Sequence, residues 1–175
     1  MNIFKVLSSN DGSINEPNVS SFLAYLLDPN ENHGLGSKLV ERFLEPIVMS
    51  SPQFYKELIY EGRIRDLSSQ SFFEVRVQAE LTVISYEDRF KKKTRDIDIV
   101  IELFNRQSAD KVPLFAFCIE NKIKDGAIVK GGKQLFEEAA GFQNYYTSEG
   151  AQAPLPSLSF IYLTPPKKQG CRLRI

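Results

Sequence analysis

Alternating apolar and polar residues predict the strands of this chain. From Phe72 to Val83 every second residue is apolar, which is typical of a long, half-exposed strand. Two further strand-like runs cover residues 94–104 and 113–123, joined by a turn. The apolar run 158–163 predicts a last, buried strand that ends before Pro165.

Apolar residues at three-to-four spacing predict helices on both sides of this strand block. Asn15 suits an N-cap and Pro17 a first turn, so a helix is expected from there to Asp28. Further apolar repeats predict a second helix over 39–47, a short helix over 54–59 and a helix over 135–146. The coarse order ααβββαβ predicts an α/β fold, with a mixed central sheet of about four strands flanked by helices. The helix before the last strand suits a right-handed crossover.

Composition limits the available chemistry. The 175 residues are 42% hydrophobic, enough for one domain, and 22 basic residues balance 22 acidic ones. Binding of nucleic acid would therefore require a local patch of basic residues. Only two cysteines and one histidine are present, which excludes a disulfide framework and histidine-rich zinc sites. The low cysteine content predicts a reducing, cytoplasmic setting. No membrane association is expected, because no apolar run is long enough to span a bilayer.

The acids of the two central strands suggest a metal site. Residues two apart in a strand share a face, so Asp96 and Asp98 project together, with Ile97 and Ile99 opposite. Glu120 and Lys122 share a face of the following strand. If the two strands are neighbours, these acids converge, and carboxylates with a carbonyl are ligands that Mg²⁺ accepts. Strand parity cannot decide between Asp96 and Asp98.

These residues resemble a known family. The segment Arg95-Asp-Ile-Asp98, then Ile119-Glu120-Asn121-Lys122, together with an acid-led helix and a Leu-Leu-Asp-Pro-Asn segment, resembles the PD-(D/E)xK nuclease superfamily and its often defence-associated bacterial branch. The resemblance spans about residues 14–164. It implies a restriction-endonuclease-like core and a metal-dependent hydrolase acting on phosphodiester bonds in nucleic acid, DNA in our interpretation, with phage defence or DNA processing as its setting.

The resemblance also implies roles for single residues. Asp98 and Glu120 would bind Mg²⁺ or Mn²⁺, with the Asn121 carbonyl as a third ligand, and Lys122 would activate water. Catalytic positions on helices would be Glu16 and a glutamine, for which we prefer Gln134 over Gln143 because the first turn of its helix lies nearest the metal. Relatives often carry Gln-Leu-x-x-Tyr at this point, and Glu138 stands in place of the tyrosine.

Further expectations concern nucleic-acid binding, the bounds of the domain and its assembly. A basic cluster is expected to contact nucleic-acid phosphates, namely Lys91, Lys92, Lys93 and Arg95. His33 is expected to be a turn residue in the helical hairpin. We expect one nuclease-like domain over 1–175, C-terminally truncated because no closing helix follows the last strand, and a homodimer or a larger defence complex as its assembly. The alternative function is an inactive module that binds nucleic acid or a protein partner.

Overall fold

The computed structural model describes residues 15–86, 92–108, 112–121, 131–148 and 155–163. Its helices are α2 (Glu16–Leu27), α3 (Lys38–Ser50), α4 (Pro52–Leu58) and α5 (Gly131–Ser148). Its strands are β1 (Ile59–Tyr60), β2 (Arg63–Ile64), β3 (Phe73–Tyr86), β4 (Lys92–Asn105), β5 (Phe115–Asn121) and β6 (Ser157–Leu163). The predicted helices and strands are all present. The small β1–β2 hairpin was not predicted, because the sequence there is short and polar.

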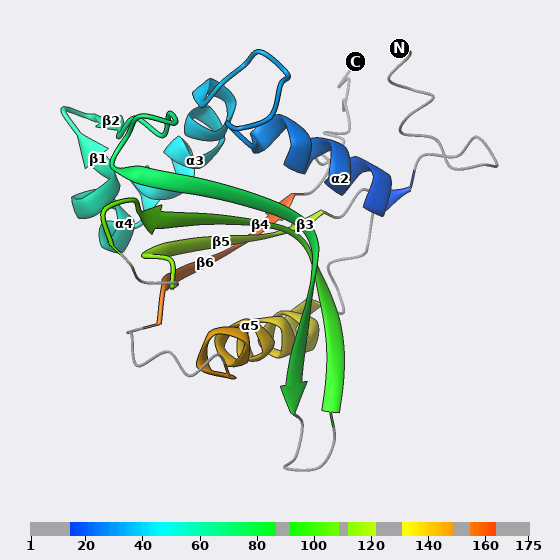
Figure 1. Ribbon diagram of the computed structural model, residues 1–175. Helices are drawn as coiled ribbons and strands as arrows, with labels where there is room; N and C mark the ends of the chain where they lie inside the picture. The colour runs from blue at the N-terminus through cyan, green and yellow to red at the C-terminus, as the bar shows by residue number, and fades with distance from the viewer. Residues whose placement is uncertain (1–14, 87–91, 109–111, 122–130, 149–154, 164–175) are drawn as a thin grey trace, which may run out of the picture.

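The central sheet has the order β3-β4-β5-β6 (Figure 1). Strands β3, β4 and β5 run antiparallel to their neighbours, whereas β6 lies parallel to β5 after the crossover through α5. This mixed sheet between helices is consistent with a restriction-endonuclease-like fold and confirms the predicted class. The parallel pair needs a long crossover, which α5 supplies.

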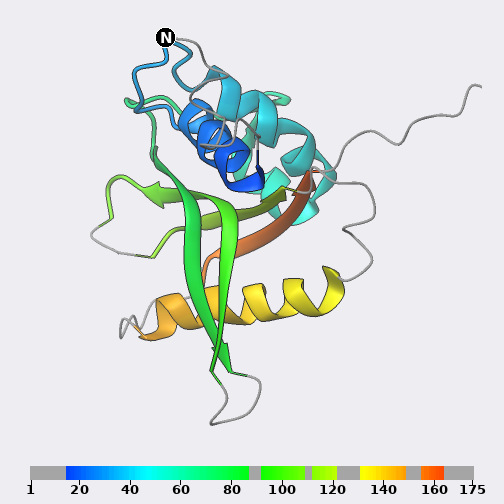
Figure 2. The same ribbon diagram turned by 90° about the vertical axis from the view of Figure 1, so that its right-hand side faces the viewer.

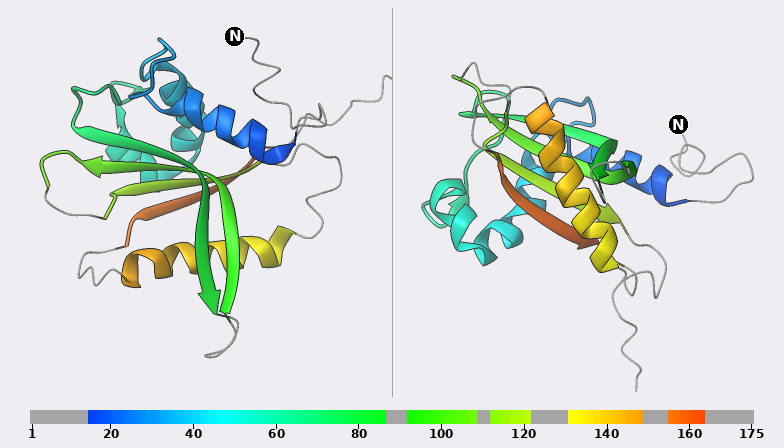
Figure 3. Two further views of the ribbon diagram at one scale, coloured as in Figure 1. Left: turned by 45° about the vertical axis from the view of Figure 1, so that its right-hand side comes forward. Right: turned by 90° about the horizontal axis from the view of Figure 1, so that it is seen from below.

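Helices cover the two faces of the sheet unequally (Figures 1 and 3). Helices α2, α3 and α4 pack on one face around fully buried residues such as Leu44, Phe117 and Ile119. Helix α5 packs on the other face, where Phe142 and Tyr146 of its predicted apolar stripe are buried beside Cys118. Within the described segments, no helix combines the length and apolar character needed to cross a membrane.

The helical hairpin is closed by side-chain hydrogen bonds that the sequence predicts. The Asn15 side chain accepts the backbone N–H of Asn18 at 3.0 Å, which caps α2. His33 lies in the following turn, where its Nδ1 accepts the Leu35 N–H at 3.0 Å and its Nε2 lies 2.8 Å from the Asp28 carbonyl oxygen. These two contacts suit a neutral imidazole with its proton on Nε2. The prediction of a turn residue at His33 is confirmed.

The β3–β4 pair is interrupted at one point. Its register runs from Phe73↔Asn105 to Tyr86↔Lys92, and the pair Glu80–Asp98 is missing from it. Glu80 has a φ of +53°, a left-handed backbone that turns a strand out of its regular alternation. On the two sides of this break, residues of one parity face opposite layers.

The break overturns one expectation about the strand faces. Ile99 packs in the cluster below α2, α3 and α4, but Ile97 packs with α5. The prediction that both isoleucines share a face was wrong because it assumed a regular strand. Beyond the break, β3 and β4 continue as a two-stranded extension, residues 81–86 and 92–97, which we call the arm.

Close backbone packing joins α5 to the arm. A Cβ atom added at Gly141 would lie 2.8 Å from Val83 Cγ2, 3.0 Å from Val83 Cβ and 3.3 Å from the Ile84 nitrogen. The last two atoms belong to, or are attached directly to, the β3 backbone and cannot move independently of it. Glycine is therefore required here by contact, although alanine is the better helix former.

Gly141→Ala is expected to destabilise the protein by up to about 2 kcal/mol. The overlap with β3 costs about 1–3 kcal/mol, and the gain in helix propensity of about 1 kcal/mol offsets part of it. Urea unfolding followed by circular dichroism measures the difference. In a Val83→Ala background, which removes Cγ2, the same substitution should cost less; an equal cost in both backgrounds would contradict the packing argument.

Candidate active site

Two acids meet at the end of β5. Pairing of β4 with β5 runs from Leu103↔Phe115 to Ile99↔Ile119, so the next position places Asp98 opposite Glu120. Residues opposite each other in an antiparallel pair have neighbouring side chains. Glu120 is only 4% exposed. The half-buried Asp98 and the buried Glu120 therefore both come just past the last β4–β5 pair, at the same end of the sheet.

Asp98 is fixed by a backbone hydrogen bond. Its Oδ2 accepts the Asn121 N–H at 2.6 Å, which satisfies a backbone donor just past the last β4–β5 pair. A hydrogen bond from a backbone N–H to a carboxylate is among the stronger ones in proteins. The interrupted pairing at Glu80 thus coincides with an acid whose side chain is turned toward β5.

Helix α5 contributes an amide to the same place. Gln134 Nε2 donates to Glu120 Oε1 at 2.8 Å and also to Glu138 Oε1 at 2.7 Å, one turn along the helix. Glu138 is only 1% exposed. Because ionised carboxylates only accept hydrogen bonds, the two acids fix which end of the Gln134 amide faces them. Gln143, the alternative glutamine, is exposed farther along α5.

Helix α2 reaches the same sheet end from the opposite face. The Asn121 side chain donates from Nδ2 to Ser20 Oγ at 3.4 Å, and both residues are buried. Glu16 lies four residues before Ser20, so the two share one face of α2. In Figure 1 both α2 and α5 begin on the side of the molecule at which β5 ends, with α2 on one face of the sheet and α5 on the other.

Asp96 is engaged elsewhere. Its Oδ1 accepts the Thr82 hydroxyl at 2.6 Å, directly across the β3–β4 pair. It is exposed on the arm, beyond the break. The structure therefore brings Asp98, and not Asp96, to Glu120, a distinction that strand parity could not make.

The residues of the predicted basic cluster do not form one surface: two of them bind α5 and another is exposed. Lys93 Nζ donates to Glu137 Oε1 at 2.7 Å, and Arg95 donates from Nε and Nη2 to Glu137 Oε2 at 2.8 and 2.6 Å. The hydrogen bond from Lys93, followed by that from Arg95, lowers the pKa of Glu137. Lys92 is exposed, and Lys91 lies outside the described residues. Lys93 and Arg95 thus join the arm to α5, and their contact with phosphates remains a prediction.

The chain is similar to a known protein family. A family model described as the PD-(D/E)XK nuclease superfamily matches residues 1–129. The chain belongs to the PD-(D/E)XK nuclease superfamily. No curated protein and no solved structure matched the chain. The matched range contains Asp98, Glu120 and Lys122, and it ends before Gln134.

Membership of this superfamily confirms the resemblance and suggests nuclease activity. Lys122 directly follows β5 but lies outside the described residues. Sequence reasoning missed Glu138, Glu137 and Ser20 as neighbours of this region. Glu138 had one usable signal: it is four residues from Gln134, so both lie on one face of a helix.

The acids at the end of β5 suit the kind of ion that this family uses, a divalent cation. Among the described residues, no group of three or more histidine, cysteine, aspartate or glutamate side chains gathers as a metal cage. Mg²⁺ commonly takes one or two carboxylates and keeps several waters. Asp98 and Glu120, adjacent at a partly open sheet end, fit that requirement.

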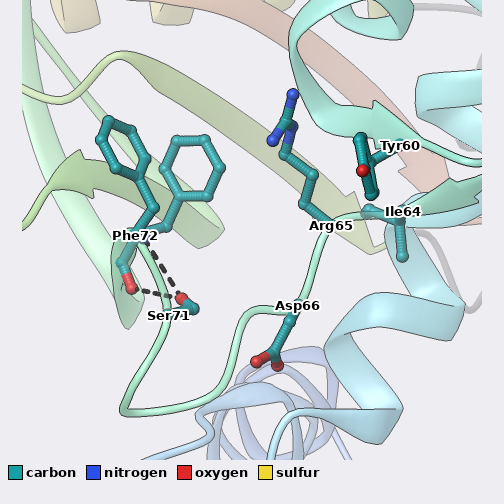
Figure 4. Close-up of a pocket in the computed structure, with 7 residues that line it drawn as sticks. Tyr60, Ile64, Arg65, Asp66, Ser71 and Phe72 are labelled. Atoms are coloured by element: carbon teal, nitrogen blue, oxygen red, sulfur yellow. Dashed lines mark hydrogen bonds between the residues drawn. The ribbon is translucent and has the colours of Figure 1, made fainter.

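A separate pocket lies at the start of β3 (Figure 4). It has a volume of about 280 Å³, and Figure 4 shows Arg65 between Tyr60 and Phe72. Its one acid, Asp66, accepts hydrogen bonds from the Ser68 N–H and hydroxyl. Because it offers no paired carboxylates and lies at the start of β3, away from Glu80 in the middle of that strand, we do not assign the chemistry to it.

A titratable acid outside the site makes stability depend on pH. Burial raises the pKa of Glu102 from 4.5 to about 7, and Arg76 opposes this shift. The folded state binds the proton of the Glu102 carboxyl group more tightly than the unfolded chain does. Protonation of Glu102 therefore stabilises the fold to its full extent below pH 4.5. The effect is lost as pH rises through about 7.

Glu102→Gln is expected to flatten this dependence. Between pH 5 and 8 the melting temperature of the wild type should fall more steeply than that of the variant, because glutamine stays neutral. Thermal unfolding at half-unit pH steps measures both curves, with Glu57→Gln, an exposed acid on α4, as the control. Parallel curves for wild type and Glu102→Gln would contradict the assignment.

Proposed function

We propose that this protein is a metal-dependent nuclease that hydrolyses phosphodiester bonds in DNA. The observations that support the proposal are the hydrogen bond from the Asn121 N–H to Asp98 at the end of β5 and the hydrogen bond from Gln134 to the neighbouring Glu120. Family membership supports the reaction class. A cellular role in defence or DNA processing, and assembly as a homodimer or a larger complex, are extensions of this proposal.

Each residue is assigned a task. Asp98 and Glu120, with the Asn121 carbonyl, would hold Mg²⁺ or Mn²⁺. A bound divalent ion polarises the phosphoryl group and makes bound water more acidic. Lys122 would hold the attacking water and offset charge on the phosphoryl oxygens. Glu16 would complete the acidic set from α2, and Gln134 keeps the Glu120 carboxylate in place.

Cleavage assays test this proposal. Purified protein is incubated with linear, circular, single-stranded and branched DNA, and with RNA, in the presence of Mg²⁺, Mn²⁺ or a chelator. The expected result is metal-dependent cleavage of DNA that disappears in Glu120→Gln. Equal background cleavage by wild type and variant would overturn the proposal. DNA binding without cleavage would instead identify the alternative, a binding module that keeps the nuclease fold.

A further inference from the structure

Strands β3 and β4 change face at a single point. On β3, Ala79 packs in the layer of α2, α3 and α4, whereas Leu81, two residues later, packs with α5. On β4 the same change falls between Ile99 and Ile97, which are the partners of those two residues. In a regular strand, residues two apart share a face. Both strands therefore turn over together at the break in their pairing.

The backbone of Glu80 accounts for this turn. The pairs before and after the break belong to one register, so no extra residue is inserted in either strand. Glu80 has a φ of +53°, and the other non-glycine residue with a positive φ in the described part of the chain is Glu61, in the turn between β1 and β2. A left-handed residue redirects the chain without changing the number of residues. We therefore attribute the turn to Glu80, and β4 follows through its pairing with β3.

Strand β5 does not follow the turn. Ile99 and Ile119, the last β4–β5 pair, both pack below α2, α3 and α4. Two residues farther, a regular ladder would pair Ile97 with Asn121 on the same face. Instead the Asn121 side chain bonds to Ser20 of α2, while Ile97 is buried with α5. Strand β4 therefore leaves β5 beyond Ile99, and Figure 2 shows the arm bending away from β5 to cross in front of α5.

Asp98 lies at the point where β4 leaves β5. Its Oδ2 accepts the Asn121 N–H at 2.6 Å, so a side chain serves as the acceptor for a β5 backbone donor just past the last pair. The carboxylate therefore points toward the backbone of β5. In a β4 that continued regularly beside β5, Asp98 would share the face of Val100, which packs in the α5 layer. The turn at Glu80 thus explains the orientation of Asp98.

We propose that Glu80 is a positioning residue of the nuclease site and that it acts through its left-handed backbone, not through its carboxylate. By turning β3 and β4 away from β5, Glu80 directs Asp98 toward the backbone of Asn121, which follows Glu120. The inference rests on the proposed nuclease function and adds to it a residue outside the metal ligands. The Glu80 side chain is exposed, and a left-handed backbone is unfavourable for a residue with a Cβ atom. Such backbone strain is concentrated at functional sites.

Three substitutions separate the backbone of Glu80 from its carboxylate and from stability. Glu80→Asn removes the charge but keeps the left-handed conformation, which asparagine adopts more readily than most residues. Glu80→Val removes the same charge and disfavours that conformation through its branched Cβ. Glu61→Val is the matched control, because Glu61 is also an exposed, left-handed glutamate. It belongs to the β1–β2 hairpin, on the opposite side of the molecule from the end of β5 (Figure 1).

The backbone amide of Asn121 reports the orientation of Asp98 without metal or substrate. In Glu80→Val its proton resonance should move upfield and its exchange with solvent should become at least about tenfold faster, as in Asp98→Ala, because the bond to the carboxylate is lost. Both properties should stay near their wild-type values in Glu80→Asn and Glu61→Val. Both valine variants should lower the melting temperature by about 2–6 °C, so a difference between them does not reflect stability.

Steady-state cleavage of DNA with Mg²⁺ gives the functional readout. Glu80→Val is expected to lower the turnover number by about ten- to a hundredfold with the KM within about twofold of wild type, whereas Glu80→Asn and Glu61→Val keep the turnover number. Equal losses in the two valine variants, equal losses in Glu80→Asn and Glu80→Val, or an unchanged Asn121 amide in Glu80→Val would overturn the proposal. Absent cleavage by the wild type, with the expected amide changes intact, would refute the nuclease function while supporting the control of Asp98 by Glu80.

Discussion

Asp98→Asn is expected to lower the turnover number for metal-dependent DNA cleavage by about a thousandfold or more while the protein stays folded. The amide oxygen of asparagine can still accept the Asn121 N–H, so the contact at the end of β5 is retained. The lost property is the negative charge next to Glu120, which a divalent cation requires. Single-turnover kinetics with Mg²⁺ measure the effect, and thermal unfolding verifies the fold.

Two further aspartates serve as comparisons for Asp98. Asp96→Asn removes the same charge two residues away, and because Asp96 pairs with Thr82 on the arm, the variant should keep most of the turnover number even if the KM for DNA rises. Asp66→Asn, in the loop before β3, should change neither constant. A larger loss of turnover in Asp96→Asn than in Asp98→Asn would reverse the assignment of the metal ligand.

Glu138→Ala is expected to lower the turnover number by about ten- to a hundredfold, the range typical of residues that orient a metal ligand. Glu138 is not among the proposed metal ligands, and we assign it a positioning role because it accepts a hydrogen bond from the Gln134 amide. Without it, the Gln134 amide loses one of the two acids that fix its orientation. Glu138→Gln should restore most of the activity, because its side-chain oxygen can accept the same N–H.

Spectroscopy separates this positioning role from a loss of stability. The side-chain amide signals of Gln134, assigned by their absence in Gln134→Ala, should shift and exchange faster with solvent in Glu138→Ala. Calorimetric titration with Mn²⁺ should show affinity weakened about tenfold. Phe142→Leu, a buried change on the same helix, is the control for general destabilisation. Unchanged amide signals and Mn²⁺ affinity in Glu138→Ala would exclude the positioning role.

The sequence predicted the strands well because their alternation reflects burial directly. Glu120 and the apolar residues around it were located correctly, since β5 is regular and buried throughout. The choice between Asp96 and Asp98 could not be made from strand parity and rested on the family resemblance. It depends on a left-handed residue in β3, and that residue is a glutamate, which gives no sequence signal of the kind that glycine would give.

Helix α5 shows a second limit of pattern reading. Its apolar stripe predicted the burial of Phe142 and Tyr146, but Glu137 and Glu138 are also buried, at 7 and 1% exposure. An apolar stripe predicts that the acids of the same helix face solvent. Glu137 and Glu138 are buried instead because they meet hydrogen-bond partners in the folded protein. Lys93 and Arg95 come from a strand more than 40 residues earlier, and no local pattern connects them with Glu137.

The parallel pairing of β5 with β6 bears on the order in which the strands around the site pair. Strands β3, β4 and β5 pair through short connections, so Asp98 and Glu120 can meet as soon as that part of the chain leaves the ribosome. Strand β6 begins 36 residues after β5 ends, and non-local pairings of this kind form slowly. We therefore expect β6 to join the sheet after β3, β4 and β5 have paired.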